Sequence, residues 1–348
     1  MNDQDYQERK KRSPKQIALI VLCAVLGVIF SVLLIVTIYF EVMMGRINRE
    51  VDNSTMSAEE YQEYLDSQKE TVDPEYTGAT VNPEDVDWGE TAATEPPKDE
   101  ILNILLIGQD RRPGEGRTRS DAIMLCTLDL HEKTLAVTSF MRDMYVQIPG
   151  YQDDRINSCY PLGGMKLLDD CLCTNFGIHV DGNVEVDFGG FAAVIDAVGG
   201  VELDLTQAEA QHLNGKYGWN LPAGTSILNG EQALGHARNR DIGNSDFERT
   251  NRQRKVINAL LEKCKTLSVL ELHDLLSQVL PMITTDLSNS EIMDYASDVF
   301  PIVSEITMDS LRIPADQTYQ YANIGGKEVL LPDLEANRQI LEDRNVKG

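Results

Sequence analysis

The chain has 348 residues and a formal net charge of −25, with 31 Lys and Arg against 56 Asp and Glu. Its hydrophobic fraction of 42% and charged fraction of 25% are ordinary for a folded protein and exclude a chain that is disordered throughout. The strong acidity argues against nonspecific binding of nucleic acid, because a phosphate backbone repels a negatively charged surface.

The first forty residues predict a membrane anchor. Residues 17–40 carry no charge, and as a helix they would span about 36 Å, enough to cross a hydrocarbon core of about 30 Å. Basic residues precede this run, which predicts a cytoplasmic tail over 1–16 and an extracellular location for the rest. A cleaved signal peptide is the alternative, but its apolar core would be shorter, about 7–15 residues. We therefore expect a single-pass protein of the cell membrane with a cytoplasmic N-terminus.

Residues 41–98 are acidic and rich in Glu, Asp, Thr and Pro. This composition predicts an extracellular stalk that is helical near SAEEYQEYLDSQKE and otherwise extended or disordered. Residues 99–348 then form one extracellular domain, which we expect to be catalytic.

The six cysteines do not predict a disulfide framework, because one lies in the anchor and the other five have no regular spacing. Cys159, Cys171 and Cys173 flank one predicted helix, and a single disulfide among them is left open. A zinc site is not expected, since no histidine cluster completes a tetrahedral set of ligands.

From residue 101 the hydrophobic pattern predicts strands and helices in irregular alternation. Strands are expected at 101–107, 122–130, 134–140, 144–149, 184–187, 201–205, 305–314 and 327–332. Helices are expected at 163–176, 188–198, 229–238, 246–264, 268–280, 289–300 and 333–344, the first of them ended by Gly177. We expect an α/β domain with a mixed central sheet sandwiched by helices.

The stretch GQDRRPGEGRTRSD, residues 108–121, concentrates arginine and carboxylate directly after an apolar strand. Asp110 leaves that strand and Asp121 begins the next one. If the two strands are neighbours, both carboxylates converge at one edge of the sheet. Two carboxylates completed by water and phosphate oxygens commonly hold Mg²⁺. The alternative is a solvated loop whose charges neutralise one another, which we favour for Arg111 and Arg117.

Other arginines lie close to these strand ends. Arg112 is two residues after Asp110, and Arg119 is two residues before Asp121. Arg142 and Asp143 end a further apolar strand in SFMRDMYV, where an ion pair that closes the strand is the simpler interpretation.

The segment HARNRDIGNSDFERTNRQRK contains the most specific arrangement. In an extended segment, Arg238 and Arg240 would share one face, so both guanidinium groups could reach one anion. One helical stripe follows at spacings of three and four: Asp246, Arg249 and Gln253. It begins at a helix N-terminus, where backbone N–H groups favour anions, and guanidinium makes planar two-point contacts to phosphate. A solvated helix face with ion pairs is the alternative.

Several catalytic classes find no support. The sequence has no G-x-G-x-x-G, P-loop, G-x-S-x-G or H-E-x-x-H motif. No Ser or Cys has a recognisable paired base, so a covalent serine or cysteine mechanism is not expected.

Taken in order, several segments resemble the LytR-CpsA-Psr family of bacterial cell-envelope proteins over roughly residues 101–265. They are NILLIGQDRR, RSDAIML, TSFMRD, RINSCYPLGG, VDFGGFAAVIDAVGGVELDL, LPAGTSILNGEQALGHARNR and DFERTNRQRKVINAL. The chain departs from the usual pattern at Ala122, where Thr is common, and at Ser245 and Glu248, which replace glycines. The region after residue 265 carries no motif that matches.

The resemblance implies roles for individual residues. Asp110 and Asp121 correspond to the acids associated with Mg²⁺, for which Mn²⁺ is an alternative. The implied pyrophosphate-binding group, called here the arginine clamp, is Arg119, Arg142, Arg238 and Arg240. The candidates for substrate binding are Arg112, Asp143, Asp246, Arg249 and Gln253.

The resemblance also implies a phosphotransferase. Its expected substrates are a glycan linked to polyprenyl pyrophosphate and the peptidoglycan that accepts it through a phosphodiester, with hydrolysis of pyrophosphate as a side reaction. The polyprenyl tail would need an apolar groove, for which FGGFAAVIDAVGG is the candidate. The general base is left open among Asp110, Asp121 and Asp143. The alternative function is a membrane-anchored module that binds or senses anionic glycolipids without turnover.

Overall fold

The computed structural model describes residues 38–49, 56–68, 73, 76–90, 92, 100–110, 117–243, 245–344 and 346. The chain divides into two compact units, residues 1–46 and 47–348. In the described part of the first unit, residues 38–44 are helical. No helix among the described residues is both long and apolar enough to cross a membrane. The predicted tail at 1–16 and residues 17–37 of the predicted anchor lie outside the described residues, so both stay predictions.

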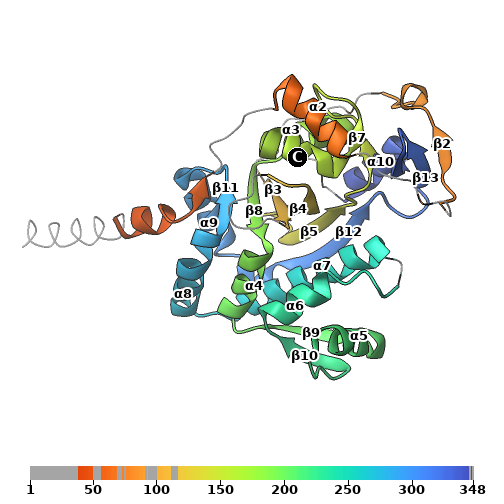
Figure 1. Cartoon of the computed structure of the whole chain (residues 1–348). Helices are drawn as coiled ribbons and strands as arrows, with labels where there is room; N and C mark the ends of the chain where they lie inside the picture. Colours follow the sequence, from red (N-terminus) through yellow and green to blue (C-terminus); the bar gives the residue numbers. More distant parts are fainter. Residues whose placement is uncertain are drawn as a thin grey trace, which may run out of the picture. The chain divides into compact units, whose positions relative to one another are not determined.

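A seven-stranded mixed sheet forms the centre of the second unit (Figure 1), in the order β1-β11-β8-β3-β4-β5-β12. Its strands are β1 (Asn48–Arg49), β11 (Ile283–Thr285), β8 (Gly182–Asp187), β3 (Ile101–Gln109), β4 (Ser120–Asp129), β5 (Thr134–Phe140) and β12 (Thr307–Ile313). β3, β4 and β5 are successively antiparallel, whereas β8 runs parallel to β3 and β12 parallel to β5. The predicted mixed sheet is therefore confirmed.

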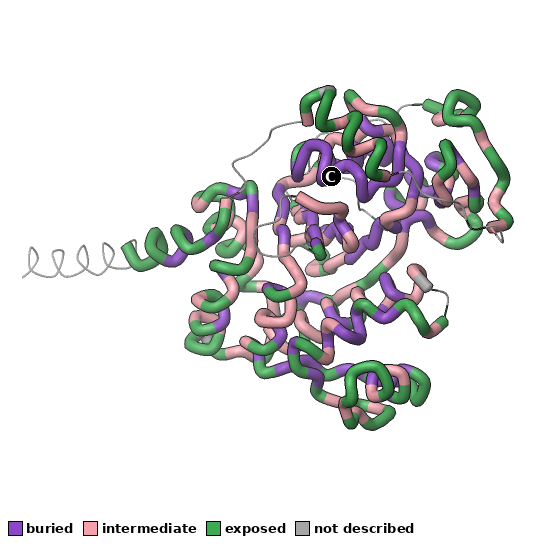
Figure 2. Tube along the Cα trace, in the orientation of Figure 1, coloured by how far each residue is buried: buried purple, intermediate pink, exposed green. Residues whose placement is uncertain are grey.

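Helices cover both faces of this sheet, as expected (Figure 1). On one face α3 (Cys159–Phe176) and α10 (Leu334–Asp343) contribute to an apolar cluster with Leu105, Ile123 and Phe140 of the sheet. Figure 2 shows α3 as one of the most continuously buried segments. On the other face lie α4 (Phe188–Ala197), α6 (Gly230–Ala237), α7 (Ser245–Cys264) and α8 (Val269–Val279), which share a second cluster.

The remaining elements lie around these layers. They are the β9–β10 hairpin (Val201–Leu205 and Gly224–Leu228), the β6–β7 pair (Tyr145–Val146 and Asp154–Arg155), α5 (Gln207–Tyr217) and α9 (Asn289–Val299). Short 3₁₀ turns occupy Pro83–Asp85, Ile156–Ser158, Leu280–Met282 and Val303–Glu305. The sequence analysis did not predict α5 or β10.

The cysteines that the structure describes form no disulfide. Free thiols are present at Cys126, Cys159, Cys171, Cys173 and Cys264.

A small sheet joins two distant parts of the chain, in the order β14-β13-β2. Its strands are β2 (Ala79–Val81), β13 (Tyr319–Ile324) and β14 (Lys327–Pro332). β2 comes from the segment expected to be a stalk, as does α2 (Ala58–Ser67), which begins with a capping box between Ser57 and Glu60. The aromatic side chains of Tyr61, Tyr64 and Trp88 pack against the main core. These parts of the expected stalk therefore pack as parts of the domain, because their aromatic residues are partly buried against its core.

Glycine sets the close approach of α6 to α4. A Cβ on Gly230 would lie 2.0 Å from the carbonyl oxygen of Ala192, and the Gly230 N–H donates to Asp196 Oδ1 at 2.7 Å. Only a residue without a side chain allows this contact. It fixes the position of α6 and hence of the turn that follows it.

Candidate functional site

Asp110 and Asp121 lie at one end of the central sheet. Asp110 directly follows β3, and Asp121 is the second residue of β4. The two strands are antiparallel neighbours, and their register shifts by one residue after Gly108. Asp121 is consequently the extra residue of a β-bulge, an irregularity that changes the direction of a side chain at a strand end. The expected proximity of the two strand ends is confirmed.

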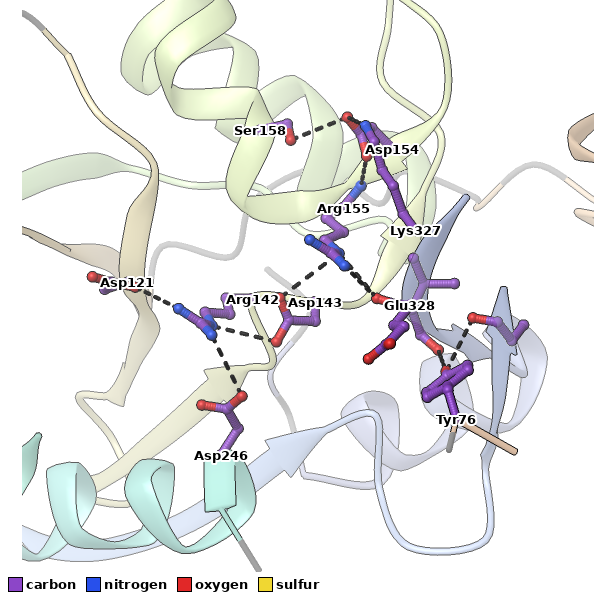
Figure 3. Close-up of polar contacts among 12 residues, drawn as sticks. Tyr76, Asp121, Arg142, Asp143, Asp154, Arg155, Ser158, Asp246, Lys327 and Glu328 are labelled. Atoms are coloured by element: carbon purple, nitrogen blue, oxygen red, sulfur yellow. Dashed lines mark hydrogen bonds and ion pairs between the residues drawn. The ribbon is translucent and has the colours of Figure 1, made fainter. Parts of the chain in front are cut away.

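Arg142 is the centre of an ion-pair network at this edge (Figure 3). Its Nη1 lies 2.8 Å from Asp121 Oδ1, its Nε 3.3 Å from Asp143 Oδ2 and its Nη2 3.6 Å from Asp246 Oδ2. Asp246 lies in the first turn of α7, where the helix dipole favours a carboxylate. Burial opposes the charge on Arg142, but the neighbouring carboxylates outweigh it, so the pKa of Arg142 is raised. Three contacts hold the guanidinium in one orientation.

Arg240 contacts two of the three carboxylates that contact Arg142. Its Nη2 lies 3.6 Å from Asp121 Oδ1 and its Nε 3.4 Å from Asp246 Oδ1. The expectation that Arg238 and Arg240 lie on an extended segment is wrong. Arg238 has helical backbone angles as the C-cap of α6, and Arg240 follows in the turn. The turn nevertheless directs both side chains to the strand ends, since Arg238 Nη2 lies 3.4 Å from Asp110 Oδ2.

A cavity of about 480 Å³, here called the charged cavity, opens beside this network. That volume lies within the usual range for ligand sites, about 300–1,000 Å³. It is lined by Tyr76, Arg119, Asp121, Met141, Arg142, Asp143, Arg155, Asn157, Asp246, Phe247, Tyr321, Glu328, Val329 and Leu330. Five predicted site residues from three separate segments of the chain thus meet in one cavity.

A second cavity, here called the apolar cavity, lies between the sheet and the helices α4, α6 and α7. Its volume is about 100 Å³. It is lined by Leu106, Ile107, Gly108, Ala122, Met124, Val184, Val186, Asp187, Phe188, Phe191, Leu234, Ala237, Arg238, Gln253 and Ile257. The lining includes Phe188 and Phe191 of the segment that the sequence analysis proposed for an apolar groove. Arg238 connects this lining to the strand ends, because its guanidinium lies 4.1 Å from the Phe188 ring centre and also contacts Asp110.

Three predicted site residues differ in place from the others. The side chain of Arg249 is only 3% exposed and lies 2.8 Å from Asp246 Oδ1, so it holds that carboxylate from behind. Burial, reinforced by Arg142 and Arg240, lowers the pKa of Arg249 to about 10. Gln253 lines the apolar cavity instead of the charged one. Arg112 lies outside the described residues.

The acid pair offers two carboxylates to a magnesium ion. The ion pairs described above use Oδ2 of Asp110 and Oδ1 of Asp121, so each carboxylate retains a second oxygen. Among the described residues, no group of three or more His, Cys, Asp or Glu side chains is placed to hold a metal. Mg²⁺ commonly binds through one or two carboxylates with water and substrate phosphates completing its shell. The residues present fit an ion of that kind, bound together with its substrate.

Several residues of the charged cavity were missed by the sequence analysis. Tyr76 comes from the expected stalk, and Tyr321 and Glu328 come from the region after residue 265 that matches no motif. The nearest signal is the alternation YQY in β13, which places Tyr319 and Tyr321 on one face of a strand. Arg155 was also missed; its Nε lies 3.8 Å from Asp143 Oδ1.

Comparisons with known proteins identify a family and a shared fold. The LytR_cpsA_psr family model matches residues 51–342. The regulatory protein MsrR of Staphylococcus aureus is 32% identical over 246 residues, which cover 70% of this chain and 73% of MsrR. The polyisoprenyl-teichoic acid–peptidoglycan teichoic acid transferase TagU of Enterococcus faecalis is 32% identical over 219 residues, covering 61% of this chain and 70% of TagU. The structure of TagT bound to LI-WTA superposes with a TM-score of 0.59 at 26% identity, covering 73% of this chain and 96% of TagT.

Proposed function

This chain belongs to the LytR-CpsA-Psr family, and we propose that it transfers an anionic glycopolymer from a polyprenyl-pyrophosphate carrier to peptidoglycan, forming a phosphodiester. The name of TagU describes the same class of reaction, and TagT is described as bound to LI-WTA. The observation that carries the proposal is a row of arginines that leads from one cavity to the other: Arg142 lines the charged cavity, Arg240 contacts Asp121 of its lining, and Arg238 lines the apolar cavity. Such a row suits a donor with a charged head group and an apolar tail.

The charged cavity supplies binding sites for a diphosphate. Arg142 and Arg240 approach one another across Asp121 and Asp246, and Arg119 lines the same cavity. Guanidinium groups contact phosphate oxygens through paired N–H donors. The carboxylates keep the arginines oriented before the donor arrives, so less conformational entropy is lost on binding.

The apolar cavity supplies the start of a site for the polyprenyl tail. Its volume of about 100 Å³ is small, so entry of the tail requires the lining side chains of α4, α6 and α7 to move apart. Arg238, which contacts both Asp110 and the Phe188 ring, would bind the phosphate that remains attached to the lipid.

The reaction needs positioning and charge stabilisation more than covalent help from the protein. In it, a sugar hydroxyl attacks the phosphorus nearer the glycan, and the bond to the polyprenyl phosphate breaks. The arginine clamp orients the diphosphate and stabilises the charge that develops on the departing phosphate. Mg²⁺ held by Asp110 and Asp121 would supply additional charge neutralisation there.

We propose the cell membrane as the location, with the N-terminus cytoplasmic and residues 41–348 extracellular. Support comes from the uncharged run at 17–40 and the basic residues that precede it. Cleavage of the chain by protease added to intact cells would test this topology; full protection of the domain would contradict it.

The experiment that tests the function uses the full-length chain in detergent, a polyprenyl-pyrophosphate-linked glycan, Mg²⁺ and peptidoglycan fragments. We expect release of polyprenyl monophosphate together with a phosphodiester-linked glycan product. Donor binding that is unchanged by a chelator, with no cleavage of any phosphate bond, would instead support the binding or sensing module.

A further inference from the structure

One wall of the charged cavity is aromatic. Tyr76, Phe247 and Tyr321 line it together with the carboxylate-bearing residue Glu328. Successive rings contact one another in a series. The ring centroids of Tyr76 and Tyr321 are 6.5 Å apart, those of Tyr321 and Tyr319 are 5.6 Å apart, and those of Tyr319 and Phe247 are 5.6 Å apart. We call Tyr76, Tyr319, Tyr321 and Phe247 the aromatic wall.

The aromatic wall is held in place from behind. The Tyr76 hydroxyl lies 3.1 Å from the carbonyl oxygen of Ala322 and 3.2 Å from that of Val329. The guanidinium of Arg312 lies 4.3 Å from the centre of the Phe247 ring. Tyr321 is nevertheless 44% exposed. Rigid rings that remain open to solvent beside a cavity indicate a surface that binds a ligand.

A chain of contacts gives the position of this wall relative to the arginines (Figure 3). Arg142 contacts Asp143, and Asp143 lies 3.8 Å from Arg155. Arg155 in turn donates from Nη2 to the backbone carbonyl of Glu328 at 2.6 Å. Asp143 therefore lies between the arginine clamp and the β13–β14 side of the cavity. A second series of contacts leads from Arg142 toward the apolar cavity through another nitrogen of its guanidinium: Arg142 Nη1 contacts Asp121, Asp121 contacts Arg240, and Arg238, two residues before Arg240, lines the apolar cavity.

The stereochemistry of phosphoryl transfer indicates which substrate lies beside the aromatic wall. The attacking and departing oxygens lie roughly in line on opposite sides of the phosphorus. The departing oxygen belongs to the polyprenyl phosphate, whose tail enters the apolar cavity. The attacking hydroxyl must approach from the opposite side, which is the side of Asp143 and the aromatic wall.

We propose that the aromatic wall is the binding site for the acceptor, a pyranose of the peptidoglycan glycan strand. The inference rests on the proposed function. The C–H face of a pyranose ring is apolar and packs on the rings, while Asp143 and Glu328 accept hydrogen bonds from its hydroxyl groups. As the acceptor oxygen forms its bond to phosphorus, its proton passes to the Asp143 carboxylate and the polyprenyl phosphate departs with the electron pair of the broken bond.

The test measures acceptor binding separately from donor binding. A peptide-free tetrasaccharide of the peptidoglycan strand is titrated into the full-length chain in detergent, and the transfer reaction is followed at varied acceptor concentration. In Tyr321→Ala we expect the acceptor KM to rise by at least about tenfold and tetrasaccharide binding to weaken equally, with a much smaller change in donor Kd. Tyr321→Phe keeps the ring and should stay within about threefold of the wild type in all three measurements.

Tyr217→Ala is the matched control. Tyr217 is 42% exposed and stacks on Trp219 at 4.4 Å, but it lines neither cavity. An unchanged acceptor KM in Tyr321→Ala, or a loss of donor affinity without a loss of tetrasaccharide affinity, would overturn the proposal; the second result would assign the wall to the glycan of the donor. A wild-type chain that binds the tetrasaccharide through Tyr321 but neither cleaves nor transfers the donor would contradict the proposed function alone.

Discussion

The charged and the apolar cavity are built on different principles, although one short segment serves both: Arg238 lines the apolar cavity and Arg240 contacts Asp121 of the charged one. The ion-pair network of the charged cavity takes its side chains from irregular positions or from element ends: a bulge in β4, the residues after β5 and the first turn of α7. The apolar cavity takes its side chains from regular faces of β3, β4, β8, α4, α6 and α7. The charged cavity should therefore depend on individual atoms, whereas the apolar cavity should depend on volume.

The largest effect is expected when Arg142 is replaced. Arg142→Ala removes a guanidinium that contacts three carboxylates and leaves Asp121, Asp143 and Asp246 partly unpaired. We expect the transfer rate to fall by about 100-fold to 1,000-fold, as for the loss of one preorganised donor to a transition-state charge. Steady-state assay of polyprenyl monophosphate release is the measurement.

Arg142→Lys keeps the charge without the planar fork and should recover only a small part of this loss. Full activity in either variant would show that the charged cavity does not depend on individual atoms as proposed.

A somewhat smaller effect is expected from Asp143→Asn. The amide keeps the shape of the side chain but cannot take the acceptor proton, and general-base contributions are typically about 100-fold or more. The loss should appear in kcat, with the donor Kd within about threefold of the wild type. A kcat equal to that of the wild type would show that Asp143 is not the general base and would leave Asp110 and Asp121 as the candidates.

An intermediate effect is expected from filling the apolar cavity. Leu234→Trp adds volume where the lipid tail would enter, so we expect about tenfold weaker binding of the polyprenyl-pyrophosphate donor. Binding of inorganic pyrophosphate, which has no tail, should change by less than about twofold. Equal weakening of both ligands would contradict the separation of the two cavities. The affinities for the donor and for inorganic pyrophosphate are measured by calorimetric titration of the same protein preparation.

The smallest effect on activity near pH 7 is expected at His236, which lies on α6 between Leu234 and Arg238. His236 is buried, and burial lowers the pKa of its imidazole to about 4. Between about pH 6.5 and pH 4 the unfolded chain binds this proton and the folded chain does not, so stability is complete above this window and falls as the pH drops through it. From pH 7 to pH 5 the loss should reach about 2 kcal/mol.

Urea unfolding of the wild type and of His236→Asn at the two pH values measures this loss as the difference between the two chains, because the buried Asp169, whose pKa burial raises to about 8, changes stability in the opposite direction over the same range in both. Because α6 serves both cavities, acid should weaken diphosphate and lipid binding together, in contrast to Arg142→Ala and Leu234→Trp. His131→Gln, at an exposed histidine, is the matched control and should not reduce the loss of stability between pH 7 and pH 5, because the hydrogen bond to Glu132 raises the pKa of His131 and so acts in the opposite direction.

Much of the fold could be predicted because local signals agree with it. Gly177 ends α3 with a φ of 70°, and Gly199 and Gly200 separate α4 from β9, as their positions in the sequence indicate. The apolar runs at 101–107 and 122–130 became neighbouring strands β3 and β4. The association of residues 76–90 with β13 could not be predicted, since pairing between segments so distant in the chain leaves no periodic signal.

The candidate site also has residues that could be predicted from the sequence and residues that could not. Asp121, Arg142 and Arg240 could be predicted because charged residues at the ends of apolar strands and helices collect at one end of a sheet. Gln253 was assigned to the charged cavity because a helical stripe gives the face of a side chain but not the cavity that this face meets. The aromatic wall was missed because its members come from three separate segments and are connected only by packing.

The most direct test of the central claim is a structure of the full-length chain with a polyprenyl-pyrophosphate-linked glycan bound. The proposal expects the diphosphate between Arg142, Arg238 and Arg240, with the first isoprenoid units between Phe191 and Leu234. A diphosphate bound elsewhere, or a tail that lies outside the apolar cavity, would contradict the assignment of one donor to both cavities.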